Sequence, residues 1–124
     1  MYSGIVREKE RIMQNEIEKL IEDINADYYD WQNCRMGPEN RTEIQAKMYD
    51  EFVNSVRVDE GSKYIRIVKQ GSVWGFIVKT DKDKLFRKGD ILKAAGFNAP
   101  ARNRARGNIL DGGYTIRWTG PLYL

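Results

Sequence analysis

The sequence contains no histidine and only one cysteine, Cys34. Without histidine the chain has no imidazole for general-base catalysis, and no Ser-His or Cys-His pair can form. Zinc sites need clusters of cysteine and histidine, so a zinc site is excluded. The two glycine motifs that cradle phosphates, GxxxxGK[ST] and GxGxxG, are missing as well. From these absences we expect that the protein is not an enzyme and that it binds neither a metal nor a cofactor.

Carboxylate clusters of the kind that hold magnesium are also scarce in the second half of the chain. Asp81 and Asp83 have a D-x-D spacing, but they lie in the lysine-rich stretch TDKDK. Charged residues in such a stretch are typical of a turn exposed to water. We therefore predict a solvated turn at these residues rather than a magnesium site.

The sequence has no long apolar run, and we expect no secretory leader. No run approaches the roughly 18 residues of a membrane span. The first residues, MYSGIVREKERIM, contain no apolar stretch after their charges. Cys34 has no second cysteine for an intrachain disulfide and no histidine to activate it, so we interpret it as a structural or incidental thiol rather than a nucleophile. We expect a cytoplasmic protein that does not contact a membrane.

The length and composition are those of an ordinary folded domain. A chain of 124 residues can bury its own core. Hydrophobic residues make up 41% and charged residues 31% of the chain, so disorder is not expected. We expect a single domain over residues 1–124, with a helical hairpin over 1–58 and a β-rich, ligand-binding part over 63–124.

Negative charge is rare in the second half. Residues 1–62 contain 14 acidic and 8 basic side chains, whereas residues 63–124 contain 4 acidic and 13 basic ones. The overall charge of +3 therefore hides a strongly basic C-terminal half. A basic surface attracts nucleic acids, nucleotides or phosphate. The alternative is that the acidic half packs beside the basic half and cancels its charge.

Apolar residues repeat with helical spacing in the first half of the chain. They predict one long helix over residues 4–35 and, after Met36-Gly37-Pro38, a second helix over 39–56. Thr42 and Gln45 have the spacing of a capping box near its start. The apolar stripe of the first helix consists of Met13, Ile17, Leu20, Ile24, Tyr28 and Trp31. An antiparallel hairpin of two helices cannot bury both stripes alone, so it must pack on the C-terminal half or on another subunit. Because the first helix is longer than a small domain needs, we expect a homo-oligomer built through these helices.

The second half is rich in β-branched and aromatic residues. It predicts a β-hairpin of residues 63–69 and 73–79, joined by Gln70-Gly71-Ser72. A short helix over 91–95 and a second hairpin of 108–110 and 114–118 are predicted to follow. The expected fold class is α+β: an N-terminal antiparallel two-helix hairpin, then an antiparallel β-sheet with a short helical insert.

The segment 96–108, GFNAPARNRARGN, carries three arginines among small and amide side chains. Forked guanidinium groups suit phosphate oxygens, and Pro100 can begin a short helix in which Arg102 and Arg106 share a face. We predict that Arg102 and Arg106 clamp a phosphate group. The alternatives are a solvated basic loop, or arginines that pair with the acidic helices.

A ligand that carries a base also needs a flat side chain on which to stack. The aromatic candidates are Trp74, Phe76, Phe97 and Trp118, and each of them can equally belong to the core. Asn98 and Asn103 are candidates to bind a base edge or a ribose hydroxyl. The candidate ligand-binding residues are Phe97, Asn98, Arg102, Asn103, Arg106, Asn108, Trp74, Arg57 and Arg117.

Three parts of the chain together resemble the phage anti-Thoeris signal sponges. They are the acidic helix pair, the hairpin KYIRIVKQGSVWGFIV, and the tail FRKGDILKAAGFNAPARNRARGNILDGGYTIRWTGPLYL, which is the most specific. The resemblance implies a phage counter-defence protein of the bacterial cytoplasm. Such a protein sequesters a cyclic ADP-ribose signal of TIR-domain enzymes, such as glycocyclic ADP-ribose, without cleaving it. It also implies homo-oligomers built from dimers, up to a hexamer, and in some members a second site for cyclic oligonucleotides.

Three other functions stay open on the sequence. The first is a basic module that binds single-stranded nucleic acid through its aromatic and cationic side chains. The second is an interaction protein that blocks a host enzyme with its helices. An enzyme comes last, because arginine and tyrosine would have to carry the chemistry without histidine.

Overall fold

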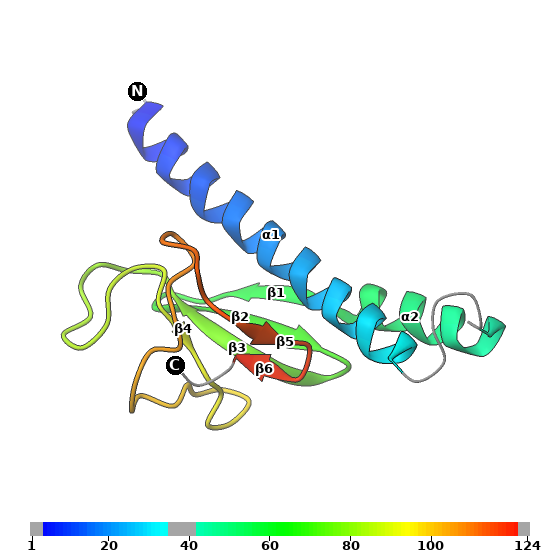
Figure 1. The fold of residues 1–124 in the computed structure, drawn as a ribbon. Coiled ribbons are helices and arrows are strands. Elements are labelled where there is room, and N and C mark those ends of the chain that lie inside the picture. Colours follow the sequence, from blue (N-terminus) through cyan, green and yellow to red (C-terminus); the bar gives the residue numbers. More distant parts are fainter. Residues whose placement is uncertain (1–3, 35–41, 122–124) are drawn as a thin grey trace.

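The computed structural model describes residues 4–34 and 42–121, with side chains described from residue 12 onward. Two helices come first, α1 (Gly4–Asn33) and α2 (Glu43–Ser55). Within the described residues, six strands follow: β1 (Arg57–Glu60), β2 (Tyr64–Lys69), β3 (Ser72–Val78), β4 (Ile91–Leu92), β5 (Ile116–Arg117) and β6 (Gly120–Pro121). Two helices followed by an antiparallel sheet confirm the predicted α+β fold (Figure 1).

The two helices are tied together where the first ends and the second begins. Thr42 and Gln45 form the predicted capping box, with Gln45 N donating to Thr42 Oγ1 and Thr42 N donating to Gln45 Oε1. Gln32 Nε2 donates to the Gln45 carbonyl oxygen at 3.0 Å, and Gln45 Nε2 donates to the Gln32 carbonyl oxygen at 3.3 Å. The predicted turn at 36–38 lies outside the described residues.

Strands β1 to β4 form one antiparallel sheet in the order β1-β2-β3-β4. The hairpin of β2 and β3 is the one that the sequence predicts. Arg57 and Val58 belong to β1, so the helical part ends at Ser55 and not at residue 58. Sequence patterns miss β1 because this edge strand is mostly exposed and charged, and so lacks an apolar alternation.

The short helix expected over 91–95 is a correction, because Ile91 and Leu92 form strand β4. Both side chains are fully buried and pair with Ile77 and Phe76 of β3. On the side of β4 away from β3, the Ile91 backbone N–H donates to the Gly107 carbonyl oxygen at 2.8 Å. Ile91 therefore has backbone partners on both sides. Because buried backbone groups must find hydrogen-bond partners, this pairing outweighs the local sequence signals for a helix.

The second hairpin also lies elsewhere than expected. β5 pairs with β6 through Ile116↔Pro121, whereas Asn108 makes an isolated bridge with Asp90. Gly107 has φ +142°, and a Cβ there would lie 2.6 Å from Tyr114 Cβ. The close approach of Tyr114 and the positive φ therefore require glycine at 107.

The sheet carries an apolar layer on each face. The larger layer packs against α1 and α2 and contains Met13, Ile17, Leu20, Ile24, Tyr28, Phe52, Ile65, Ile67, Trp74, Ile77, Ile91 and Ile109. The smaller layer contains Phe76, Val78, Phe86 and Leu92, with Ala94 and Ala105 packed against it. In Figure 1 the helices lie on one side of the sheet, and the yellow and light-orange loops that follow β4 lie on the other, whereas the darker orange loop before β5 rises toward α1. Segment 93–106, which follows β4 and contains Arg102, Arg104 and Arg106, therefore packs on the face away from the helices.

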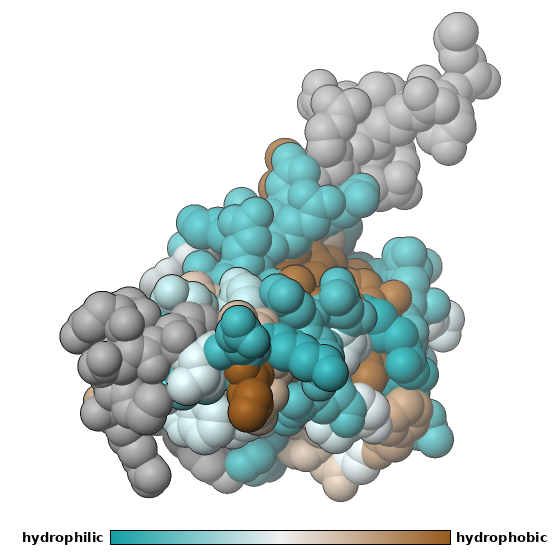
Figure 2. Space-filling view, turned by 90° about the vertical axis from the view of Figure 1, so that its right-hand side faces the viewer, coloured by the Kyte–Doolittle hydropathy of each residue, from teal (hydrophilic) through white to brown (hydrophobic). Residues whose placement is uncertain are grey.

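Both helices keep exposed apolar side chains. Ile12 and Trp31 of α1 and Ile44 and Met48 of α2 are exposed, and Ile44 is 72% exposed. Figure 2 shows the side on which α2 lies, with hydrophobic residues in a largely hydrophilic surface. In residues 4–34 and 42–121, neither helix combines the length and apolarity of a membrane-crossing segment. The sheet thus covers only part of the apolar surface of each helix.

Candidate functional site

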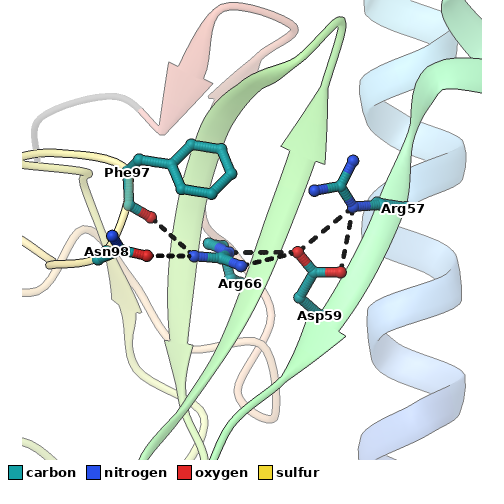
Figure 3. A network of polar contacts seen from close by, with 5 residues as sticks. All are labelled: Arg57, Asp59, Arg66, Phe97 and Asn98. Carbon is teal, nitrogen blue, oxygen red and sulfur yellow. Dashed lines mark hydrogen bonds and ion pairs between the residues drawn. The ribbon is translucent and has the colours of Figure 1, made fainter.

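The face of the sheet away from the helices holds two neighbouring groups of polar side chains. Tyr64 and Arg66 are two residues apart on β2, so both point to this face. Each contacts segment 93–106: Arg66 reaches Phe97 and Asn98, and Tyr64 reaches Arg102. The first group, the Phe97 cluster, comprises Arg57, Asp59, Arg66, Phe97 and Asn98 (Figure 3).

Arg66 holds the Phe97 cluster together. Its Nη1 donates to the Phe97 carbonyl oxygen at 3.0 Å and to Asn98 Oδ1 at 2.9 Å, and its Nη2 donates to Asp59 Oδ2 at 3.0 Å. The guanidinium Cζ lies 4.3 Å from the centroid of the Phe97 ring, a cation–π distance. Figure 3 shows Arg66 between the loop residues on one side and Asp59 on the other. The exposed Phe97 ring is therefore held against a fixed cation.

Asp59 links this cation to a second one. Arg57 Nε donates to Asp59 Oδ1 at 3.1 Å, while the remaining guanidinium nitrogens of Arg57 have no hydrogen-bond acceptor among the described residues. Hydrogen bonds from Arg57 and Arg66 hold the pKa of the Asp59 carboxyl below its usual value. Asp59 therefore stays ionised near neutral pH and orients both arginines.

The Phe97 cluster presents three groups that suit a nucleotide. Phe97 is 45% exposed although Arg66 lies over its ring, so ring surface remains accessible. Asn98 Oδ1 accepts from Arg66, which leaves the Asn98 Nδ2 group to donate outward. The outer nitrogens of Arg57 can contact a phosphate. A stacking ring, an amide donor and a guanidinium fork thus occur in one small area.

The second group surrounds a cavity of about 500 Å³ and is named the lysine pocket here. It lies between the start of β2, the loop after β3 and segment 93–106. The residues that line it are Lys63, Thr80, Lys82, Asp83, Lys84, Leu85 and Arg102. Four of these side chains are cationic and one is anionic. The pocket is therefore strongly basic.

Asp83 is not in a solvated turn, and this prediction was wrong. Its side chain is only 10% exposed, and it accepts two hydrogen bonds of 2.9 Å from Arg102. Asp83 Oδ1 also accepts from the backbone N–H groups of Leu85 and Phe86, at 2.8 and 3.1 Å. The two residues of the ion pair are 19 positions apart, so no local pattern reveals their contact.

The pKa of the Asp83 carboxyl is lowered far below its usual value, chiefly by the hydrogen bonds from Arg102 and then by the Leu85 N–H group. A lowered pKa in the folded state means that the stabilising effect is complete above the unfolded-state pKa of about 3.9. That effect is lost as the pH falls below this value. We expect the melting temperature of the wild type to fall more steeply between pH 5 and 2.5 than that of Asp83→Asn, measured by circular dichroism.

Asp81→Asn is the matched control for this pH experiment. Asp81 lies two positions away in the same loop and makes no ion pair with any described residue. Its variant is expected to keep the steep acid profile of the wild type. Parallel profiles for the wild type and Asp83→Asn would show that the Asp83–Arg102 pair does not stabilise the folded state.

The predicted phosphate clamp of Arg102 and Arg106 is not assembled in this structure. Residues 101–107 are not helical, so the two arginines do not share a helix face. Arg102 bonds to Asp83 and Tyr64, and its guanidinium lies 5.0 Å from the Phe86 ring centroid. Arg106 is 1% exposed and donates to Asn103 Oδ1. Ligand binding by this pair stays a prediction that would require rearrangement of the segment.

Two candidate asparagines bond to their own loop. Asn108 is buried, and its Nδ2 donates to the Lys88 carbonyl oxygen and to Asp90 Oδ1, both at 2.9 Å. Asn108 Oδ1 accepts from Leu110 N at 2.8 Å. Asn103 is exposed and accepts from Arg104 N. Asn108 therefore holds the loop together, whereas Asn103 keeps an amide nitrogen toward solvent.

The remaining candidates do not belong to the Phe97 cluster. Trp74 is 1% exposed, packs with the helix-side core, and donates from Nε1 to the Arg117 carbonyl oxygen at 2.8 Å. The Arg117 side chain is exposed, and its Nη1 lies 3.7 Å from Oδ1 of Asp27 on α1. Trp118 packs edge-on against Tyr28 at a centroid distance of 5.1 Å. Phe76 belongs to the smaller core layer. Phe97 is thus the exposed ring among the four aromatic candidates.

Sequence reasoning missed Arg66 and the lysines of the pocket. A signal for Arg66 existed, because Tyr64 and Arg66 alternate with Ile65 and Ile67 and so mark a polar face of β2. The lysines carried no such signal. Lys63 precedes β2 and Lys82 lies in the loop after β3, and only the folded chain brings them to one pocket.

Comparison of the chain with protein-family models, with curated proteins and with solved structures found no match. The functional proposal therefore depends on the geometry of the Phe97 cluster and the lysine pocket, and on the resemblance of the sequence segments.

Proposed function

We propose that this protein binds a cyclic ADP-ribose signal and withholds it from its receptor without cleaving it. The observation that carries the proposal is the Phe97 ring, exposed to solvent and supported by Arg66 at 4.3 Å. In this proposal the protein acts in the cytoplasm of a bacterial host as a phage counter-defence protein. Glycocyclic ADP-ribose is the isomer that the resemblance favours.

The chemistry of the ligand matches the groups of the Phe97 cluster. A cyclic ADP-ribose carries an adenine, two riboses and two phosphates. We propose that the adenine stacks on the accessible surface of Phe97, an interaction worth about 1–3 kcal/mol per base. Asn98 Nδ2 then donates to a base nitrogen or a ribose oxygen, and Arg57 binds a phosphate. Arg66 stays with Asp59 and keeps the ring in place.

The state of Asp59 supports binding without cleavage. Asp59 is the carboxylate of the Phe97 cluster, and it is bonded to two arginines that lower its pKa. A carboxylate with a lowered pKa is a poor general base, because it gives little driving force for proton removal. The cluster is therefore better suited to hold a nucleotide than to hydrolyse one.

Sequestration also supports the proposal of a homo-oligomer. Nanomolar binding corresponds to about −12 kcal/mol, which a small polar ligand reaches in a closed, largely desolvated pocket. A ring that is 45% exposed does not close around a ligand within one subunit. Exposed apolar residues on the helices, such as Ile44 and Trp31, supply surface for a dimer or a hexamer, and in this proposal a neighbouring subunit covers the Phe97 cluster. Sedimentation of the purified protein measures the subunit number.

A release experiment tests the proposal. The protein is incubated with extract from cells that contain an activated TIR-domain enzyme, washed and heat-denatured, and the supernatant is analysed by mass spectrometry. We expect an intact cyclic ADP-ribose isomer, and the same analysis detects any cyclic oligonucleotide from a second site. An empty supernatant would contradict the proposal, and a linear product would show an enzyme. Heat-denatured protein incubated with the extract is the control.

One observation also favours a single-stranded nucleic-acid module as second candidate. Segment 93–106 contains the exposed Phe97, and its Arg102 lines the pocket together with three lysines, so stacking and charge occur along one segment. Affinity for an oligonucleotide falls steeply with salt because many counterions are released. Affinity for a ligand with two phosphates falls less. A salt titration with a labelled oligonucleotide therefore separates the two candidates.

A further inference from the structure

We propose that the lysine pocket is an anion site for two linked phosphate groups, separate from the Phe97 cluster. The proposed ligand chemistry is a pyrophosphate, either inorganic or carried by a nucleoside diphosphate. This inference goes beyond the proposed function, because it makes no use of stacking on Phe97 and holds for an inorganic ligand. It depends on the charge, the shape and the internal hydrogen bonds of the pocket.

The charges of the pocket are unbalanced. Asp83 is the one carboxylate among the lining residues, and both of its oxygens accept hydrogen bonds from Arg102. Lys63, Lys82 and Lys84 form no ion pair with any described residue. The side chains of these three lysines therefore line one cavity and leave it with a net positive charge after Asp83 and Arg102 have neutralised each other. A bound anion relieves their mutual repulsion.

The walls of the pocket are held in shape before any ligand arrives. Thr80 Oγ1 accepts from Lys82 N at 3.1 Å, and Asp83 accepts from the backbone of Leu85 and Phe86. Arg102 then fastens this loop to segment 93–106 through Asp83. A preformed site lowers the entropic cost of ordering side chains on binding. The Thr80 hydroxyl accepts one bond and keeps its proton to donate to a ligand oxygen.

The number and arrangement of the cations favour a compact polyanion. Lysine ammonium groups act as point charges that bind phosphate without the planar match that arginine requires. A single carboxylate would satisfy only one of three ammonium groups, whereas pyrophosphate carries several charges within a few atoms. The lysines line one cavity of about 500 Å³ rather than a stripe along the surface, which favours a small ligand over a polymer.

Calorimetry with inorganic pyrophosphate at low salt tests this proposal. We expect wild-type protein to bind and the double variant Lys82→Gln/Lys84→Gln to bind at least about tenfold more weakly, because two charge-assisted contacts are lost. Lys19→Gln/Lys47→Gln is the matched control. It removes the same charge from exposed positions on α1 and α2, and is expected to bind like the wild type.

Two further binding measurements complete the test, one with the Phe97→Ala variant and one with ADP as the ligand. Phe97→Ala should leave pyrophosphate binding unchanged, so a failure of the Phe97 cluster does not affect this test. ADP in place of pyrophosphate distinguishes the source: tighter binding of ADP that is weakened in Lys82→Gln/Lys84→Gln indicates a nucleotide in the pocket, and equal binding indicates an inorganic ligand. The absence of pyrophosphate binding in the wild type, or equal weakening in the control variant, would overturn the proposal.

Discussion

Replacing Trp74 with alanine is expected to lower the free energy of unfolding by about 3–5 kcal/mol. Trp74 is 1% exposed and packs in the core between the sheet and the helices. The substitution removes an entire indole from this core, and the cavity cannot collapse fully because neighbouring side chains are held by the sheet. Urea unfolding followed by circular dichroism measures the change.

Trp74→Phe separates the apolar contribution from the hydrogen bond. Phenylalanine keeps most of the buried ring but leaves the Arg117 carbonyl oxygen without the Nε1 donor. An unpaired buried acceptor costs about 1–3 kcal/mol, so this variant is expected to be intermediate. If Trp74→Ala instead kept wild-type stability and lost nucleotide binding, Trp74 would be a ligand contact, as the sequence alone allowed.

Replacing Phe97 with alanine is expected to weaken binding of cyclic ADP-ribose, used as the probe, by about tenfold or more. The variant loses a stacking surface worth about 1–3 kcal/mol per base. Because Phe97 is 45% exposed and lies outside both core layers, little core packing is lost, and the melting temperature should change by no more than a few degrees. Calorimetry measures the affinity, and a thermal melt of the same sample measures the stability.

Two matched variants define what the ring contributes. Phe97→Leu keeps an apolar side chain at this position but removes the aromatic face, and is expected to bind nearly as weakly as Phe97→Ala. Phe97→Trp enlarges the face and is expected to bind at least as tightly as the wild type. Wild-type affinity in Phe97→Ala and Phe97→Leu would place the nucleotide elsewhere on the protein.

Local patterns predicted the elements whose residues interact with near neighbours. The stripe from Met13 to Tyr28 is buried as the spacing requires, and Thr42 caps α2 as its distance from Gln45 indicates. The hairpin of β2 and β3 also follows from a short range of sequence, because a turn fixes its register. These features depend on contacts that a few residues specify.

Long-range pairing decided the elements that the patterns missed. Ile91 and Leu92 are a strand because β3 and the backbone at Gly107 offer partners on both sides. The charged residues of β1 become an edge strand because β2 is available beside them. The partners of Ile91 lie outside the window that a local pattern covers, so its outcome depends on the competition among backbone groups for hydrogen bonds. Strand β1 pairs with its neighbour in sequence, and it was missed because its exposed, charged residues show no apolar alternation.

The sequence by itself determined the types of groups available: no histidine, a basic second half, and an arginine-rich segment that contains Phe97 and Asn98. Only the tertiary structure decided their roles. Arg102 meets Asp83 and Arg106 is buried, whereas Arg66, from a strand 31 positions before Phe97, supports the exposed ring. Charge and chemistry belong to single residues, but exposure and pairing depend on which distant residues fold against them, and these decide which groups can meet a ligand.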